Sequence, residues 1–204
     1  MRRTRRAAAI TFAILLASAP ALPAQDRGLG VKGGVNVATQ QVSGEADAPV
    51  PSVRIGAVVG AFYILPVASW LGLQVEGLYT AKGSKLESFG ISSTAQIDYV
   101  EVPLLARVQL GTGHRHYYVE GGAAPAFRVR ARAVTSFTGA TESLDITEQV
   151  ETIDLGVVGG GGIVLGAFSI DGRYTFGVRD VDADKTDSSR TKNRVLAVTA
   201  GYRF

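Results

Sequence analysis

Residues 193–204 read NRVLAVTAGYRF, a stretch in which two kinds of side chain alternate. From Leu196 to Phe204 every second residue is apolar or aromatic, whereas the residues between them are small, polar or charged. A period of two places consecutive side chains on opposite faces of a β-strand. The stretch therefore predicts a strand with one apolar and one polar face, and the fold depends on how many such strands the chain contains.

Seven further segments show the same alternation, and none of them has the helical period of 3.6 residues. The clearest is 167–178, in which aromatic and aliphatic residues alternate with Ser169, Asp171 and Arg173. The other six are 29–37, 53–65, 71–82, 96–110, 115–132 and 150–165. Pro103 inside the 96–110 segment predicts a bulge or a locally unpaired ladder, because proline has no N–H to donate.

The first 24 residues have the layout of a secretory signal peptide. Four arginines within residues 2–6 precede an apolar run at 7–19, and small residues follow at 19, 21 and 24. The apolar run is shorter than the roughly 20 residues that a membrane-spanning helix needs. We expect cleavage after Ala24, with cleavage after Ala21 as the alternative, which leaves residues 25–204 as the mature barrel domain.

The charge balance changes once the leader is removed. The chain has 21 Lys and Arg against 18 Asp and Glu, and four of the basic residues lie in the leader, which leaves 17 against 18. The basic isoelectric point is therefore no sign of a nucleic-acid partner. The absence of cysteine excludes disulfides, a lipidated cysteine and thiolate metal sites. An exported chain that is 46% hydrophobic, has 25 glycines and lacks a long apolar run after the leader fits a membrane protein built of strands.

The connections between the segments alternate in length. Four are long and rich in Ser, Thr, Asp and Gly, at 40–52, 83–95, 133–149 and 179–192, whereas those after the second, fourth and sixth segments are a few residues each. Short turns on one side and long loops on the other are typical of outer-membrane barrels, with the turns in the periplasm. The pattern predicts an all-β fold, an eight-stranded antiparallel up-and-down transmembrane β-barrel in the bacterial outer membrane.

The aromatic residues indicate which face meets lipid. A soluble carrier barrel would place its apolar face inward. Here the apolar face carries many aromatic residues near strand ends, where the girdles of a membrane barrel lie. We therefore expect this face to contact outer-membrane lipids. Its aromatic residues are Tyr63, Trp70, Tyr79, Tyr117, Phe127, Tyr174, Phe176, Tyr202 and Phe204.

The opposite face mixes glycines with charges of both signs. Such residues suit the narrow interior of an eight-stranded barrel, where they can pair and fill the space. We expect a structural network of interior charges formed by Lys32, Arg54, Glu76, Glu101, Arg107, Glu120, Arg128, Asp154, Asp171, Arg173 and Arg203.

Four stretches carry a resemblance to a known family. They are QVEGLYTAKG (74–83), YVEVPLLARV (99–108), AFSIDGRYTFG (167–177) and VTAGYRF (198–204). In order and spacing they resemble the porin-family outer-membrane β-barrel domain proteins, a PorT-like group of small bacterial barrels, over nearly all of the mature chain. The resemblance implies an outer-membrane barrel and no particular activity. The last stretch also resembles the closing strand read by the barrel-assembly machinery, which makes Tyr202 and Phe204 the expected assembly signal.

No catalytic residue is expected. Enzymatic barrels need a nucleophile or a base near the outer rim, and histidine is the usual choice. The chain has two histidines, His114 and His116, which lie in or beside an expected periplasmic turn and have no acidic neighbour in sequence. We interpret both as polar turn residues.

Two further patterns resemble binding motifs without completing them. The run from Gly159 to Gly162 lacks both G-x-G-x-x-G and a following Lys-Ser/Thr, so we expect it to relieve crowding or to allow sharp curvature. Asp180, Asp182 and Asp184 have the spacing of calcium ligands, but Lys185 replaces the required glycine and Thr191 the bidentate glutamate. We expect a solvated loop there, and neither a metal nor a cofactor.

Three functions remain open at this point. The leading one is a non-enzymatic barrel that supports the outer membrane or presents its loops for binding and adhesion to an unidentified extracellular ligand. A narrow porin-like channel for small solutes is the first alternative, disfavoured because side chains can fill an eight-stranded barrel. An outer-membrane lipid-modifying enzyme is the second, disfavoured because no histidine is expected at the outer rim.

Overall fold

The computed structural model describes residues 27–43, 53–88, 91–137, 140–178 and 190–204. The expected signal peptide and the three aspartates at 180, 182 and 184 lie outside these residues. No helix in the described part is long and apolar enough to cross a membrane.

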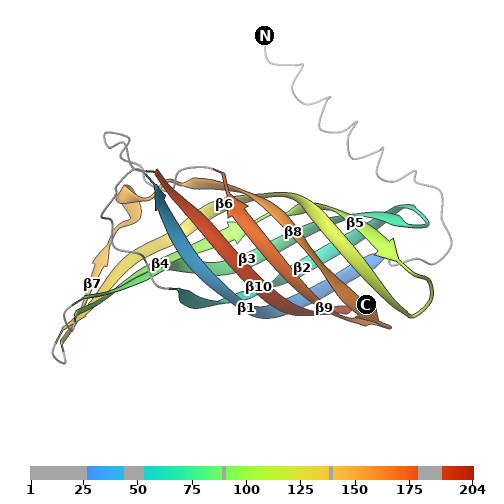
Figure 1. Cartoon of the computed structure of the whole chain (residues 1–204), viewed down its shortest axis with the longest axis horizontal. Helices are drawn as coiled ribbons and strands as arrows, with labels where there is room; N and C mark the ends of the chain where they lie inside the picture. Colours follow the sequence, from blue (N-terminus) through green and yellow to red (C-terminus); the bar gives the residue numbers. More distant parts are fainter. Residues whose placement is uncertain (1–26, 44–52, 89–90, 138–139, 179–189) are drawn as a thin grey trace, which may run out of the picture.

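Ten strands and one short 3-10 helix make up the described fold (Figure 1). They are β1 (Gly28–Ser43), β2 (Arg54–Ala68), β3 (Leu71–Ser88), β4 (Ile91–Glu101), β5 (Leu104–Leu110), β6 (Arg115–Phe137), β7 (Ala140–Asp145), η1 (Thr147–Gln149), β8 (Ile153–Leu165), β9 (Phe168–Gly177) and β10 (Arg190–Arg203).

The sheet closes on itself into a ring of eight strand positions. Every pairing is antiparallel, and β1 pairs with both β2 and β10, so the first and last strands meet. Going round, the order is β1, β10, β9, β8, β6, β4 with β5, β3 and β2, while β7 pairs with β6 beside the ring. The all-β, antiparallel, up-and-down arrangement expected from the alternation is therefore confirmed.

β4 and β5 share one position in the ring, interrupted at Val102 and Pro103. The interruption predicted from Pro103 is confirmed, yet the wall stays closed there. Glu76 N donates to Pro103 O at 3.0 Å, and Val102 N donates to Pro125 O at 2.9 Å. The proline therefore ends a regular ladder without opening a gap between β3 and β6.

Two of the expected long loops are mostly strand, so those loop predictions are wrong. β3 and β4 continue pairing out to Ser88 and Ile91, and β6 and β7 pair out to Phe137 and Ala140. These extensions are rich in Ser and Thr and lack an apolar face, so a period of two in hydropathy cannot reveal them. Among the described strands, β3, β4, β6 and β7 form this extension, which Figure 1 shows beyond the ring at the end away from the C terminus.

The apolar face points outward and the charged face inward. All nine aromatic residues named for the apolar face are exposed, from 37% for Tyr174 to 73% for Phe204, whereas Glu76 on the inner face is only 2% exposed. Short turns at 69–70, 111–114 and 166–167 join the strands at one end, which we call the turn end. Gly166, with φ of +69°, allows the two-residue turn at 166–167. The opposite end is called the loop end.

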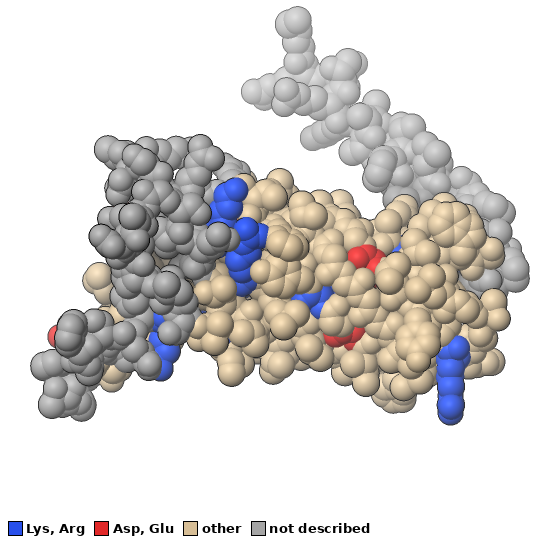
Figure 2. All heavy atoms as spheres, viewed as in Figure 1, with Lys and Arg blue, Asp and Glu red and all other residues tan. Residues whose placement is uncertain are grey.

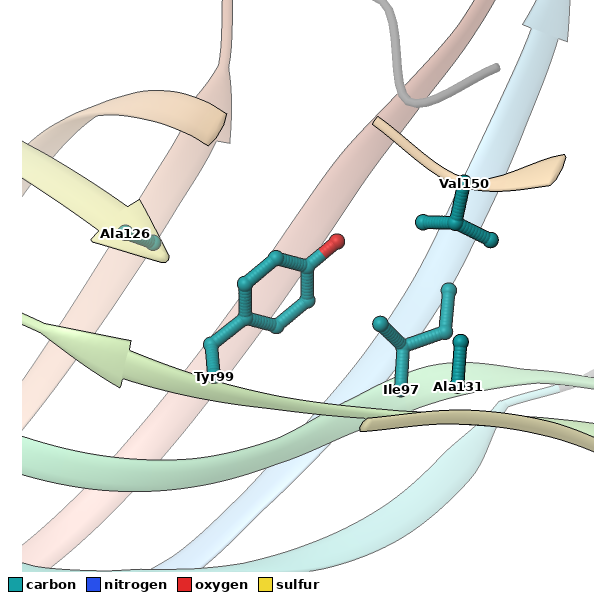
Figure 3. Packing of buried hydrophobic residues seen from close by; sticks show 5 residues of the cluster. All are labelled: Ile97, Tyr99, Ala126, Ala131 and Val150. Atoms are coloured by element: carbon teal, nitrogen blue, oxygen red, sulfur yellow. The ribbon is translucent and has the colours of Figure 1, made fainter. Parts of the chain in front are cut away.

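One apolar cluster is buried toward the loop end. Ile97 and Tyr99 of β4 pack with Ala126 and Ala131 of β6 and with Val150, which follows η1 (Figure 3). The register between β4 and β6 shifts between Asp98 and Tyr99. This cluster attaches the η1 connection to the ring.

Candidate functional site

The centre of the barrel holds five charged residues that contact one another, here called the central cluster. Lys32 Nζ lies 3.2 Å from Glu76 Oε1 and 3.2 Å from Asp171 Oδ2. Arg173 Nη1 and Nη2 lie 2.5 and 2.8 Å from the two Glu76 oxygens, and Arg173 Nε lies 2.6 Å from Glu120 Oε1 and 3.0 Å from Asp171 Oδ1. Four strands, β1, β3, β6 and β9, therefore meet through ion pairs across the interior.

The central cluster contains one more negative than positive group, because three carboxylates surround two cations. All five side chains are at most 7% exposed. Arg173 binds Glu76 with two parallel hydrogen bonds, the geometry that gives guanidinium–carboxylate pairs their strength and direction. The arrangement holds the facing walls of the ring at a set distance.

Neutral polar residues extend the central cluster toward the walls. Thr199 Oγ1 donates to Asp171 Oδ1 at 2.9 Å, and Gln74 Nε2 donates to Glu76 Oε1 at 2.5 Å. Arg107 Nη1 donates to Gln74 Oε1 at 2.9 Å, and its guanidinium lies 3.5 Å from the centre of the Tyr118 ring. Arg107 thus contacts the cluster through the Gln74 amide and the face of the Tyr118 ring.

A second group lies nearer the loop end and is called the loop-end cluster. Lys82 forms an ion pair with Glu101, and its Nζ lies 3.9 Å from Asp154 Oδ2. Asn193 Nδ2 donates to the same Asp154 oxygen at 2.8 Å. The Lys82 ammonium also lies 5.0 Å from the centre of the Tyr99 ring, so this cluster borders the apolar cluster of Figure 3.

Space between the two clusters is small. A cavity of about 30 Å³ lies among Thr80, Lys82, Glu101, Arg173, Thr175 and Thr199, with apolar side chains on its other sides. That volume corresponds to about two water molecules. Side chains therefore fill most of the interior at this level.

The glycine run in β8 makes room for large side chains. A Cβ on Gly162 would lie 2.3 Å from Ile170 O and 2.7 Å from Tyr118 Oη. A Cβ on Gly160 would lie 2.5 Å from Gly172 O and 3.1 Å from Arg173 Cγ. Both glycines occupy the inward row, so the run relieves crowding around the interior, one of the two roles expected for it.

Eight of the eleven charges predicted for the interior lie in or beside the two clusters. They are Lys32, Glu76, Glu101, Arg107, Glu120, Asp154, Asp171 and Arg173. Three others bind backbone near strand ends. Arg54 Nη1 donates to Lys82 O, Arg128 Nε donates to Glu151 O at 3.4 Å, and Arg203 Nη2 donates to Gly166 O at 3.5 Å.

Several interior partners were not among the predicted charges. Lys82 is the clearest, because its position has the same parity as Gln74 and Glu76 on β3 and therefore points inward with them. Gln74, Thr199 and Asn193 are uncharged, so a search for charges alone passes over them. Parity along each strand would have found all four. Their partners depend on how the strands pair, as for Thr199, which is in register with Asp171 on β9.

The two histidines lie at the turn end. His114 is in the turn itself, whereas His116 lies in β6 beside it and is only 5% exposed. His116 Nδ1 lies 2.9 Å from Gly113 O within the turn end, and His114 is exposed. Among the residues that the structure describes, no group of three or more His, Cys, Asp or Glu side chains could hold a metal ion.

Comparison with known proteins identifies the family. A family model described as "outer membrane protein beta-barrel domain" matches residues 23–183. The chain belongs to this family, which confirms the family expected from the sequence and the location in the bacterial outer membrane. A search of curated protein sequences gave no significant match.

Solved structures with a similar fold are small outer-membrane barrels. Ail, the attachment invasion locus protein of Yersinia pestis, is 19% identical with a TM-score of 0.50, covering 88% of this chain and 100% of Ail. Neisserial surface protein A is 15% identical with a TM-score of 0.52, covering 87% and 97%. The outer membrane enzyme PagL is 11% identical with a TM-score of 0.44, covering 86% and 99%. At these identities the likeness concerns the fold alone.

Proposed function

We propose that this member of the outer membrane protein β-barrel domain family is a non-enzymatic barrel that presents a projecting β-sheet for binding outside the cell. The observation that carries the proposal is the extension of four strands beyond the ring. It consists of residues 83–88, 91–96, 132–137 and 140–145, here called the projecting sheet. A paired sheet holds its residues in a defined arrangement, so less conformational entropy is lost when it binds a partner than when a solvated loop does.

The edges of the projecting sheet support a binding role. Among the described strands, β7 pairs only with β6, and the pairing of β2 with β3 ends at Val58 and Thr80. Leu144 on β7 is 65% exposed, next to the exposed Glu142 and Asp145. The sheet thus offers apolar and acidic groups together at a free edge.

The filled interior supports a non-conducting barrel. The central and loop-end clusters cross the lumen, and the cavity between them is the size of about two waters. A solute would have to displace buried ion pairs, whose separation leaves uncompensated charges in a poorly solvated space. We expect the purified protein in a planar bilayer to show no steady conductance, and large stable channels would favour the porin-like alternative.

The orientation belongs to the same proposal. The turn end faces the periplasm and the projecting sheet faces outward, as in barrels with short inner turns and long outer segments. Phe204 N donates to Leu29 O at 3.0 Å at the turn end. The proposed assembly signal, Tyr202 and Phe204, is then on the side from which the assembly machinery acts.

Cysteine labelling tests the orientation directly. The chain has no cysteine, so single substitutions give unambiguous sites. On whole cells, a membrane-impermeant maleimide should label Thr141→Cys in the projecting sheet and leave Thr112→Cys in a turn unlabelled. Labelling of Thr112→Cys alone would reverse the orientation.

A shortened variant tests the binding role. Bacteria carrying the full chain should adhere to cultured cells or matrix-coated surfaces more than bacteria carrying a variant with residues 134–143 replaced by a tight Asn-Gly turn. Replacement of Thr112 by Ser at the other end is the control and should adhere like the unmodified chain. Equal adhesion of all three strains would contradict the proposal. A change in the mass of membrane lipids that depends on the protein would also contradict it, because it would indicate a lipid-modifying enzyme.

A further inference from the structure

A buried threonine between the two clusters has no hydrogen-bond partner within the described chain. Thr80 lies on β3 with the same parity as Glu76 and Lys82, so its side chain points into the barrel, where it is only 3% exposed. No group of the described residues hydrogen-bonds to its Oγ1 atom. A buried hydroxyl without a partner costs free energy, because it has given up its hydrogen bonds to water. Thr80 therefore needs a partner other than these side chains.

The outer wall at this level gives Thr80 no access to bulk water. Tyr79 on the same strand and Val59, in register with it on β2, project from the outer surface and are 41% and 55% exposed. Figure 2 shows mostly residues other than Lys, Arg, Asp and Glu on the visible surface between the two ends of the ring. We expect lipid rather than water against such a surface. A partner for Thr80 must therefore come from the lumen.

The cavity between the two clusters lies on the lumen side of Thr80 and has a volume of about 30 Å³. A buried water needs roughly 10–15 Å³ of such space and two to four polar partners. Three threonines contribute to the lining, Thr80, Thr175 and Thr199, together with Lys82 and Glu101. A hydroxyl both donates and accepts, an ammonium donates and a carboxylate accepts. The cavity thus has the room and the partners for about two water molecules.

Water fits this lining better than an ion does. Lys82 and Arg173 would repel a cation, and Glu101 would repel an anion. An ion would also have to lose its hydration shell in a poorly solvated space. Val58 and Val195, on the apolar sides of the cavity, cannot replace that shell. A neutral molecule that can both donate and accept is the best match.

We propose that the cavity binds two water molecules, one of them held by Thr80, and that they join the loop-end cluster to the central cluster. Lys82 and Glu101 of the loop-end cluster line the same cavity as Arg173 of the central cluster. A bridging water is nearly as favourable in enthalpy as a direct hydrogen bond. The interior then forms one continuous polar network that holds water and excludes larger solutes. This inference goes beyond the binding role of the projecting sheet and does not depend on it.

Thr80→Val tests whether the hydroxyl has a partner, because valine keeps the shape of the side chain and removes only the hydroxyl. If water binds Thr80, the substitution removes one partner of that water and should lower the midpoint of urea unfolding in detergent micelles. If the hydroxyl is unpaired, the same substitution removes a buried polar group without a partner and should raise the midpoint. An unchanged or raised midpoint would therefore overturn the proposal.

Thr94→Val is the matched control. Thr94 is half-buried on β4 in the projecting sheet and does not line the cavity. Threonine and valine are both β-branched and both suit a strand, so the midpoint of this variant should stay close to that of the unmodified barrel. A fall as large as that of Thr80→Val would assign the loss to the exchange itself and would count against the proposal.

A crystal structure of the mature barrel grown in a bromide salt identifies the occupant directly. Two ordered waters should lie within hydrogen-bonding distance of the polar lining, one of them on Thr80 Oγ1, and that water should be lost in Thr80→Val. A cavity without density, or an anomalous bromide peak in it, would overturn the proposal. Neither outcome bears on the adhesion of the shortened variant, so a failure of the water site can be told from a failure of the proposed function.

Discussion

Neighbouring residues on β9 and β10 face opposite environments. Arg173 and Thr199 point into the barrel, where they bind Glu76 and Asp171. Tyr174 and Val198, one residue away on each strand, project from the apolar outer surface. The inner row depends on complementary charges, whereas the outer row depends on transfer to lipid. One strand therefore meets two different requirements: charge pairing on its inner face and an apolar surface on its outer face. A substitution that disrupts one face need not disturb the other.

The largest effect is expected from Arg173→Ala. The change leaves Glu76, Glu120 and Asp171 with Lys32 as the one remaining cation of the central cluster. Loss of one member of a buried ion pair costs about 3–5 kcal/mol. Urea unfolding in detergent micelles, followed by the fluorescence of the single tryptophan, Trp70, measures the loss.

The control for this change is Arg128→Ala. Arg128 is half-buried and binds a backbone carbonyl and the Thr152 hydroxyl near a strand end. Its removal should lower the free energy of unfolding by less than about 1 kcal/mol. Similar losses in the free energy of unfolding for Arg173→Ala and Arg128→Ala would mean that the central cluster adds no stability of its own.

A lysine placed on each face gives the next largest effect. Val198→Lys puts a charge against lipid near the middle of β10, at a cost of about 2–4 kcal/mol. Thr199→Lys puts the same charge beside Asp171 and the small interior cavity, in a cluster with one excess negative group. We expect a clearly higher folding yield in lipid vesicles for Thr199→Lys, and the reverse order would invert the face assignment.

Two alanines in the glycine run compare the faces without charge. Gly162→Ala would bring a methyl group against Ile170 O and Tyr118, at a cost of about 1–3 kcal/mol. Gly159→Ala points outward, where nothing lies within 4 Å, and should change stability by less than about 1 kcal/mol. Thermal unfolding in the same detergent measures both variants. Equal changes in melting temperature would show that the interior tolerates the extra methyl group.

A small effect on stability is expected from Phe204→Ala on the outer surface. Phe204 is 73% exposed, and its ring contacts that of Tyr202 with centroids 5.5 Å apart. Loss of that contact costs about 1 kcal/mol. Assembly in cells should nevertheless slow, as measured by pulse labelling and heat-modifiable migration, if Phe204 is part of the assembly signal. Normal assembly kinetics of the Phe204→Ala variant would show that Phe204 is not part of the assembly signal.

The alternation of side chains was enough to predict strands, their number around the ring and their two faces. Parity along each strand also selected eleven charged residues for the interior. Eight of them lie in or beside the two clusters, and Lys82 was not among the eleven. It failed at the projecting sheet, where residues 83–88 and 91–95 are strand although their composition is that of a loop. A strand with both faces in water does not need apolar residues at every second position. A hydropathy pattern therefore cannot reveal such a strand.

The sequence by itself determined the local quantities of this protein: strand parity, the break at Pro103 and the outward aromatic residues. These follow from backbone geometry and from the properties of single side chains. Only the tertiary structure decided that Arg173 meets Glu76 and Glu120, and that Lys82 lies between Glu101 and Asp154. Most of those partners lie on strands far apart in sequence. Which charges meet depends on the register and closure of the whole ring, because a shift of two residues in one strand keeps every face and changes every partner.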